Sequence, residues 1–223
     1  MTEAVADSSV AHLDPVSRKR EHRVVLAIIA GHLLLALPLG FTLNIWVDEY
    51  YTLETTSKGL LFVFEHCRDF QLAPPLYYLL VWSWRQIDDS YLLVRSLSSI
   101  ISASSLWFVH LAARRWFPKL PTPWIILPLA VNPWVVYAST EIRPYCMVPF
   151  WSAALLYFFH GGFMAESPRR YERWLFTASA VLAMYTFYYL GFFLPGFALV
   201  LVLARRWRPL RDYVSLMALA SLL

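Results

Sequence analysis

The sequence has few charged residues, little cysteine and no internal repeat. Only 15% of its 223 residues are charged and 59% are hydrophobic, whereas a soluble domain has about 25% charged and about 45–50% apolar residues. This shortage of charge excludes an ordinary soluble domain and favours a polytopic membrane protein. The two cysteines, Cys67 and Cys146, form no CxxC spacing, which excludes a disulfide framework and a cysteine zinc motif.

Basic residues are in excess, with a net charge of +4 and an isoelectric point near 9.1. They gather at the ends of apolar runs, where positive charge orients membrane spans. We therefore reject nucleic acid as a partner and take the membrane lipid as the surroundings of the chain.

The apolar runs predict an all-α, polytopic bundle of about six complete spans and a truncated seventh. The expected spans are residues 24–43, 91–113, 122–139, 144–163, 173–188 and 190–204, and the short run is 213–223. Because the last run is too short to cross a bilayer, we expect the chain to be part of a longer protein. Residues 1–23 are expected to be a disordered cytoplasmic tail, and 24–223 the transmembrane domain, with a retained first span.

The segment 74–87 is apolar but too short to cross a membrane, which suits a helix lying on the surface. We expect 44–90 to be one outer loop with juxtamembrane helices over 52–66 and 75–87, and 139–144 to be a second outer loop. This topology leaves most of the 19 basic residues on the cytoplasmic side. Those remaining outside are Lys58, Arg68, Arg85, Arg95 and Arg143.

Asp48 and Glu49 follow the first span directly. A solvated pair that marks the membrane boundary is one interpretation. The other is catalytic, since a carboxylate at this interface can act as a general base, and adjacent acids suit a divalent cation such as Mg²⁺ or Mn²⁺.

A second polar group, Glu141, Arg143 and Tyr145, is expected on the same side of the membrane and at the same depth. A charge pair at a helix start would explain it, and so would an arginine that grips phosphate. Convergence with Asp48 favours the second interpretation. The candidate substrate-binding residues are Glu141, Arg143, Tyr145, Pro74, Pro75 and Tyr77.

The order of these motifs over residues 24–205 resembles the N-terminal part of GT-C glycosyltransferases of the protein mannosyltransferase and aminoarabinose transferase type. The motifs are Asp48-Glu49, Pro74-Pro75-Leu76-Tyr77-Tyr78, Ser90-Tyr91-Leu92-Leu93-Val94-Arg95, Asn132-Pro133 and Thr140-Glu141-Ile142-Arg143-Pro144-Tyr145. The chain departs from the family at Ala73 and Phe187, where members often carry histidine.

The resemblance implies transfer of a sugar from a polyprenyl-phosphate donor to a hydroxyl of a glycan, lipid or protein, with inversion. Asp48 would accept the hydroxyl proton. Arg143, or a divalent cation held by Asp48, Glu49 and Glu141, would stabilise the departing phosphate. Short loops favour a bacterial inner membrane, with the N-terminus cytoplasmic and the active site on the outer face.

Two other functions compete with this one. A transporter or flippase for a lipid-linked sugar would need polar or broken helices at mid-membrane depth, often in inverted repeats. A non-catalytic scaffold or decayed enzyme would explain the absent histidines.

Overall fold

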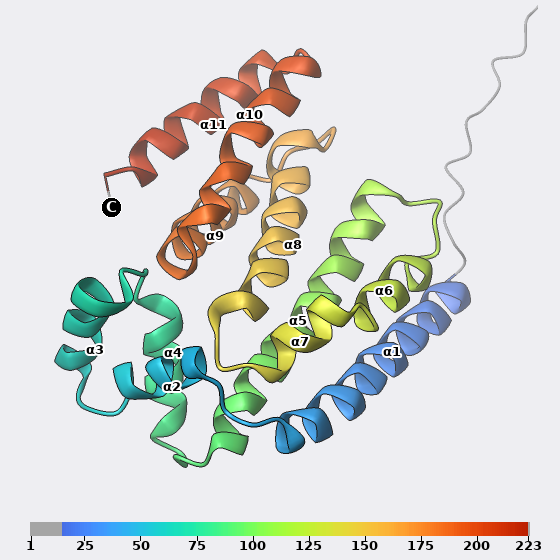
Figure 1. Cartoon of the computed structure of the whole chain (residues 1–223). Helices are drawn as coiled ribbons and strands as arrows, with labels where there is room; N and C mark the ends of the chain where they lie inside the picture. The colour runs from blue at the N-terminus through green and yellow to red at the C-terminus, as the bar shows by residue number, and fades with distance from the viewer. Residues whose placement is uncertain (1–14, 223) are drawn as a thin grey trace, which may run out of the picture.

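The computed structural model describes residues 15–222, most of which are helical and none of which form a strand (Figure 1). The α-helices are α1 (Pro15–Thr42), α2 (Val47–Thr55), α3 (Leu60–His66), α4 (Leu76–Arg85), α5 (Tyr91–Trp116), α6 (Pro123–Ala130), α7 (Pro133–Thr140), α8 (Met147–Phe159), α9 (Arg170–Thr186), α10 (Phe193–Leu203) and α11 (Trp207–Ala220). Short π and 3₁₀ segments are η1 (Cys67–Gln71), η2 (Pro144–Cys146), η3 (His160–Met164) and η4 (Tyr188–Phe192). The all-α prediction is confirmed.

Three helical segments of the described chain are long and apolar enough to span a membrane. They are Arg18–Thr42, Tyr91–Trp116 and Pro144–Met164, with mean hydropathies of 2.4, 1.5 and 1.2. They coincide with three of the predicted spans. The other apolar runs lie in shorter helices, such as the 17-residue α9.

The sequence predicted one continuous span over 122–139, but this prediction is wrong: the run is not a single helix. It divides into α6 and α7 at Asn132, whose side-chain oxygen accepts hydrogen bonds from the backbone N–H groups of Trp134 (2.9 Å) and Val135 (3.4 Å). Pro133 occupies the first turn of α7, where its missing N–H costs nothing. The Asn-Pro pair therefore ends one helix and caps the next.

The predicted helix 52–66 is also wrong in extent. It divides into α2 and α3 because Thr56 and Ser57 donate side-chain hydrogen bonds to the backbone at the end of α2. Gly59 then precedes α3 in an extended conformation. The second predicted juxtamembrane helix, 75–87, agrees with α4.

The chain ends differ from the sequence expectation as well. Helix α1 begins at Pro15, so residues 15–23 are helical rather than a disordered tail. Residues 1–14 lie outside the described residues. Helix α11 begins at Trp207 and carries Arg208, Arg211 and Asp212, so it is more polar than the predicted run 213–223.

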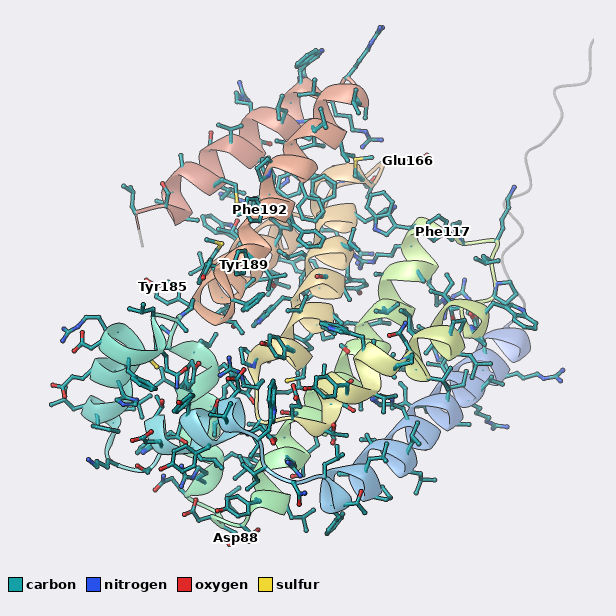
Figure 2. The ribbon with its side chains drawn as sticks, viewed as in Figure 1. Asp88, Phe117, Glu166, Tyr185, Tyr189 and Phe192 are labelled. Carbon is teal, nitrogen blue, oxygen red and sulfur yellow. The ribbon has the colours of Figure 1, made fainter. Side chains whose placement is uncertain are left out.

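Helix α5 lies at the centre of the bundle and packs against α8, α1 and α7 (Figure 1). Helices α9, α10 and α11 continue from α8 on one side, whereas α2, α3 and α4 form a compact group at one end. In Figure 2, Asp88 marks that end of the molecule, and Phe117 and Glu166 mark the opposite end.

Interlocking aromatic rings hold α8, α9, α10 and α11 together. Phe159 and Phe197 have ring centroids 4.5 Å apart, and Phe176 lies 5.7 Å from Tyr213. Outside this core, many large apolar side chains are exposed, such as Leu34 (75%) and Trp124 (73%). An exposed apolar surface on this scale is typical of a protein that contacts lipid.

A buried ion pair ties α5 to α9 near the end marked by Phe117. Glu172 is 1% exposed and accepts hydrogen bonds from Arg115 at 2.5 and 3.1 Å. Arg169 adds a third contact at 3.3 Å. Gly161 lies against this pair: a Cβ there would overlap the Glu172 carboxylate and approach Arg115 Nη1 to 2.5 Å. The close approach of the two segments therefore requires glycine.

Gly161→Ala is expected to lower stability by about 1–3 kcal/mol, because the added methyl group overpacks the ion pair. Gly196→Ala on α10 is the matched control, since a Cβ there meets nothing within 4 Å. Thermal unfolding in detergent compares the two variants. Equal midpoints for both would contradict the packing described here.

Candidate functional site

Helix α2 carries Asp48 and Glu49 in its first turn, where the helix dipole favours negative charge. The chain leaves α1 at Thr42 and enters α2 at Val47. The backbone N–H of Trp46 donates to Glu49 Oε2 at 3.4 Å, which caps the start of the helix. The two acids then point to different surroundings.

Glu49 is 1% exposed and forms an ion pair with Arg95 of α5, itself 5% exposed. Arg95 Nε donates to Glu49 Oε1 at 3.0 Å, and Arg95 Nη2 donates to Oε2 at 2.7 Å. The backbone N–H of Ile142 also donates to Oε1 at 3.0 Å. One carboxylate therefore joins α2, α5 and the turn after α7.

Arg95 uses its remaining donors on the end of α1. Nη1 donates to the carbonyl oxygens of Gly40 (2.7 Å) and Leu43 (2.6 Å), and Nη2 donates to that of Asn44 (3.1 Å). All five donors of the guanidinium are thus engaged. The cation also satisfies carbonyl groups that a helix end leaves without partners. The sequence pattern did not predict this role for Arg95, although a basic residue one turn inside an apolar run is a signal for it.

Asp48 is the more accessible acid, with 34% of its side chain exposed. Its Oδ2 lies 3.7 Å from Nη2 of Arg143, whose side chain is 17% exposed. Arg143 Nη1 makes long contacts of 3.4 Å to the Asp48 carbonyl oxygen and to Thr52 Oγ1. The two predicted polar groups therefore meet, with a loosely held arginine beside an accessible carboxylate.

Glu141 is 3% exposed, and neither of its carboxylate oxygens has a hydrogen-bond partner within the described residues. Burial raises the pKa of Glu141 above its ordinary value and the charge of Glu49 raises it further, whereas the Tyr137 hydroxyl, which lies nearby without the geometry of a hydrogen bond, lowers it. Arg143 Nε is buried without a partner too. Unsatisfied buried groups are rare in folded proteins, and here three such atoms belong to two neighbouring site residues.

The predicted tyrosines lie around Arg143 but differ in access. Tyr77 is fully buried, with its hydroxyl 3.3 Å from Ser98 Oγ, so it belongs to the core. Tyr78 is nearly buried, and burial raises its pKa to about 12 although the charge of Arg143 lowers it. The Arg143 guanidinium lies 5.7 Å from the centroid of the Tyr145 ring. Of these three tyrosines, Tyr145 alone is partly exposed.

The predicted prolines do not join this group. Pro75 precedes α4 and lines a separate cavity of about 400 Å³ with Phe64, Cys67 and Ala73. Within the described residues, no interaction links Pro74 or Pro75 with Asp48 or Arg143. Their role in the structure is to begin α4, which suits the fixed φ of proline.

Asp48, Glu49 and Glu141 do not fit a cation site in this arrangement. Both oxygens of Glu49 are engaged by Arg95, so no free carboxylate oxygen remains there for a metal. No group of three or more His, Cys, Asp or Glu side chains in residues 15–222 is arranged to hold a metal ion. A divalent cation stays a prediction from the resemblance, without a ligand set here.

An apolar cavity of about 420 Å³ lies beside the site, between α4, α5, α8 and α9. Its lining includes Leu76, next to Tyr77, and Met147, one helical turn beyond Arg143. The other lining residues are Leu80, Leu97, Ile101, Ser104, Phe150, Trp151 and Leu182. The polar group at Asp48 therefore adjoins a space suited to a hydrocarbon chain.

Aromatic rings extend from Tyr145 along the end of α9. Tyr145 and Phe187 form an edge-to-face pair at 6.3 Å, and Phe187 continues to Tyr189 at 5.3 Å. Figure 2 shows Tyr185, Tyr189 and Phe192 along this stretch. The sequence did not predict the contact between Phe187 and Tyr145, because it joins segments 42 residues apart.

Comparison with protein-family models, with curated proteins and with solved structures finds no match to this chain.

Arg95→Gln is expected to lower the free energy of unfolding by about 3–5 kcal/mol, because it leaves Glu49 as an uncompensated buried charge. The double variant Glu49→Gln/Arg95→Gln should recover part of that loss. The control is Arg68→Gln, which breaks an exposed pair with Asp69 (74% and 60% exposed) and should leave stability unchanged. Chemical denaturation in detergent measures all three. An Arg95→Gln protein as stable as the control would refute this role of the buried pair.

The raised pKa of Glu141 gives a pH-dependent prediction. The unfolded carboxyl ionises near its ordinary pKa of 4.5, so the stability from the neutral buried form is present below that pH. It is lost as pH rises through the folded pKa. Glu141→Gln stays neutral and is expected to match the wild type in acid but exceed its stability at neutral pH.

Thermal unfolding across this pH range measures the effect, with Glu54→Gln on α2 as the control for loss of one carboxylate from an exposed residue. A stability difference between Glu141→Gln and wild type that is independent of pH would contradict burial as the cause.

Proposed function

We propose that this protein is a membrane glycosyltransferase of the GT-C type. It transfers a sugar from a polyprenyl-phosphate donor to an acceptor hydroxyl at the outer face of the membrane. The observation that carries the proposal is the accessible Asp48 carboxylate, 3.7 Å from Arg143, on a helix fixed by a fully buried ion pair. An accessible acid beside a guanidinium that is held only by long contacts is suited to proton transfer next to an anionic leaving group.

Asp48 acts as the general base in this reaction. It accepts the proton of the acceptor hydroxyl while that oxygen forms a bond to the anomeric carbon of the donor sugar. The bond between the anomeric carbon and the phosphate oxygen breaks, and its electron pair leaves with the polyprenyl phosphate. A single displacement inverts the anomeric configuration. Arg143 stabilises the charge on the departing phosphate through its unengaged Nε and its loosely held Nη groups.

The surroundings give Glu49 and Arg95 a positioning role. Glu49 contacts Arg95 and the backbone of Ile142, so it holds α2 in place and has no free oxygen for the reaction. Glu141 is buried within reach of the charge of Glu49, and burial raises its pKa. No step of the proposed reaction uses a metal ion.

The apolar cavity supports a lipid-linked donor. Its volume of about 420 Å³ holds several isoprene units, and its walls are almost entirely apolar. A donor with its chain between α4 and α8 would bring its phosphate toward Arg143. Tyr145, with its ring near the guanidinium, would border the sugar.

The orientation follows from charge. Figure 2 shows Phe117 and Glu166 at the end opposite the α2–α4 group. Arg114 and Arg170 lie within one helical turn of them in sequence, and Arg206 donates to the carbonyl oxygens of Phe163 and Ala165 at 3.4 Å. We assign that end to the cytoplasm by the positive-inside rule, which leaves Asp48 outside. The proposed topology has six spans and a shortened seventh in a bacterial inner membrane. In this topology, three further spans join the three long ones. One is formed by α6 and α7 together, one by α9, and one by η4 and α10 together.

The test is donor turnover. The chain is reconstituted in lipid, supplied with a panel of polyprenyl-phosphate sugars and a crude acceptor extract, and each donor is followed by mass spectrometry. Asp48→Asn is expected to reduce turnover by about 10²–10⁴-fold, the usual contribution of general-base catalysis. Glu54→Gln, which removes an exposed carboxylate from the same helix, should retain wild-type turnover.

A folded Asp48→Asn protein with most of its turnover would exclude Asp48 as the base. If the folded wild-type protein consumes none of the donors, the transporter or the scaffold interpretation is favoured instead.

A further inference from the structure

The end of the molecule opposite Asp48 carries a concentrated positive charge. Residues 166–212 contain seven arginines against three acids, a net of +4 that equals the formal charge of the whole chain. These charges lie on the segments that lead into α9 and α11 and on the first turns of those two helices. A field of one sign over a small surface attracts anions.

A cavity of about 240 Å³ opens between α9 and α11 within this charged region. Its lining is Arg170, Arg173, Trp174, Asp212, Ser215 and Leu216. Arg173 donates to Asp212 at 2.5 Å and to the carbonyl oxygen of Gly162 at 2.8 Å, so this pair forms a fixed and neutral wall. The positive charge available to a ligand comes from other arginines.

Arg170 in the lining supplies part of that charge, and Arg208 and Arg211 supply the rest from α11, outside the lining. All three are exposed, and within the described residues none of them makes a hydrogen bond or an ion pair. Arg208 and Arg211 are three residues apart on α11 and Ser215 follows four residues later, so they share one face of the helix. Guanidinium groups in such a row bind phosphate oxygens, often in bidentate fashion.

The surroundings of the cavity are those of a membrane interface. Tyr171 (57%), Trp174 (48%) and Trp207 (62%) are exposed at the same end, and such rings settle at headgroup depth. Beyond them, Leu175 (43%) and Val214 (54%) continue the exposed surface as apolar side chains. A ligand seated here would meet arginine at one end and hydrocarbon at the other.

We propose that this cavity binds the phosphate of an anionic phospholipid headgroup in the cytoplasmic leaflet. Arg170 and Arg211 contact the phosphate, Ser215 donates to it, and the acyl chains follow the apolar faces of α9 and α11. Basic pockets between helices on the cytoplasmic side bind lipid headgroups in this way. The leaflet rests on the orientation given under the proposed function, but the inference does not depend on the transfer reaction at Asp48, and its test requires no turnover.

The test is lipid retention. The chain is placed in nanodiscs of equal parts phosphatidylglycerol and phosphatidylcholine, released, and examined by native mass spectrometry for bound lipid. The wild type is expected to retain phosphatidylglycerol in preference to phosphatidylcholine. Arg170→Gln/Arg211→Gln should weaken retention by about five-fold per arginine, the factor that corresponds to the ~1 kcal/mol a basic residue contributes near an anionic surface.

Arg18→Gln/Arg20→Gln is the matched control, because it removes two exposed arginines from the start of α1 without touching the cavity. Equal losses in the two double variants would overturn the site in favour of diffuse attraction. Absence of a preference for phosphatidylglycerol would overturn it as well, and so would complete displacement of the lipid by inorganic phosphate. Thermal unfolding midpoints equal to wild type exclude misfolding as the cause.

Discussion

The structure depends on the ion pair between Arg95 and Glu49. Burying two charges costs several kcal/mol per ion unless the geometry and the remaining hydrogen bonds compensate. Here every donor of Arg95 is used, two on Glu49 and three on carbonyl groups at the end of α1. Glu49 also accepts from the backbone of Ile142. The pair fixes α1, α2, α5 and the turn after α7 relative to one another, and so determines where Asp48 lies.

The polar groups of this site contrast with those elsewhere in the bundle. Glu172 is equally buried, but three arginine contacts satisfy it. His32 is buried between helices, with its ring nitrogens 2.7 Å from the Ala130 carbonyl oxygen and 3.1 Å from Ser102 Oγ. Within the described residues, only Glu141 and Arg143 bring together a buried carboxylate and a buried guanidinium nitrogen that lack hydrogen bonds. Buried polar groups without hydrogen bonds are unfavourable, and they persist where the rest of the fold holds them in position. Such exceptions cluster at functional sites.

The sequence predicted the helical class and three long apolar helices because periodicity and run length depend only on neighbouring residues. It also located α4, and it brought Asp48 and Arg143 to the same end through charge alone. It could not predict the division of the run 122–139, because tertiary packing decides whether an Asn-Pro pair bends or ends a helix. Nor could it assign Arg95 to Glu49, since the partners are 46 residues apart and nothing local links them.

A structure of the chain with a polyprenyl phosphonate analogue of the sugar donor would test the central claim most directly. We predict that the phosphonate oxygens lie within about 3 Å of the Arg143 guanidinium, that the anomeric carbon faces Asp48, and that the polyprenyl chain lies in the cavity between α4 and α8. An analogue bound away from Arg143, with Asp48 turned from the sugar, would contradict it.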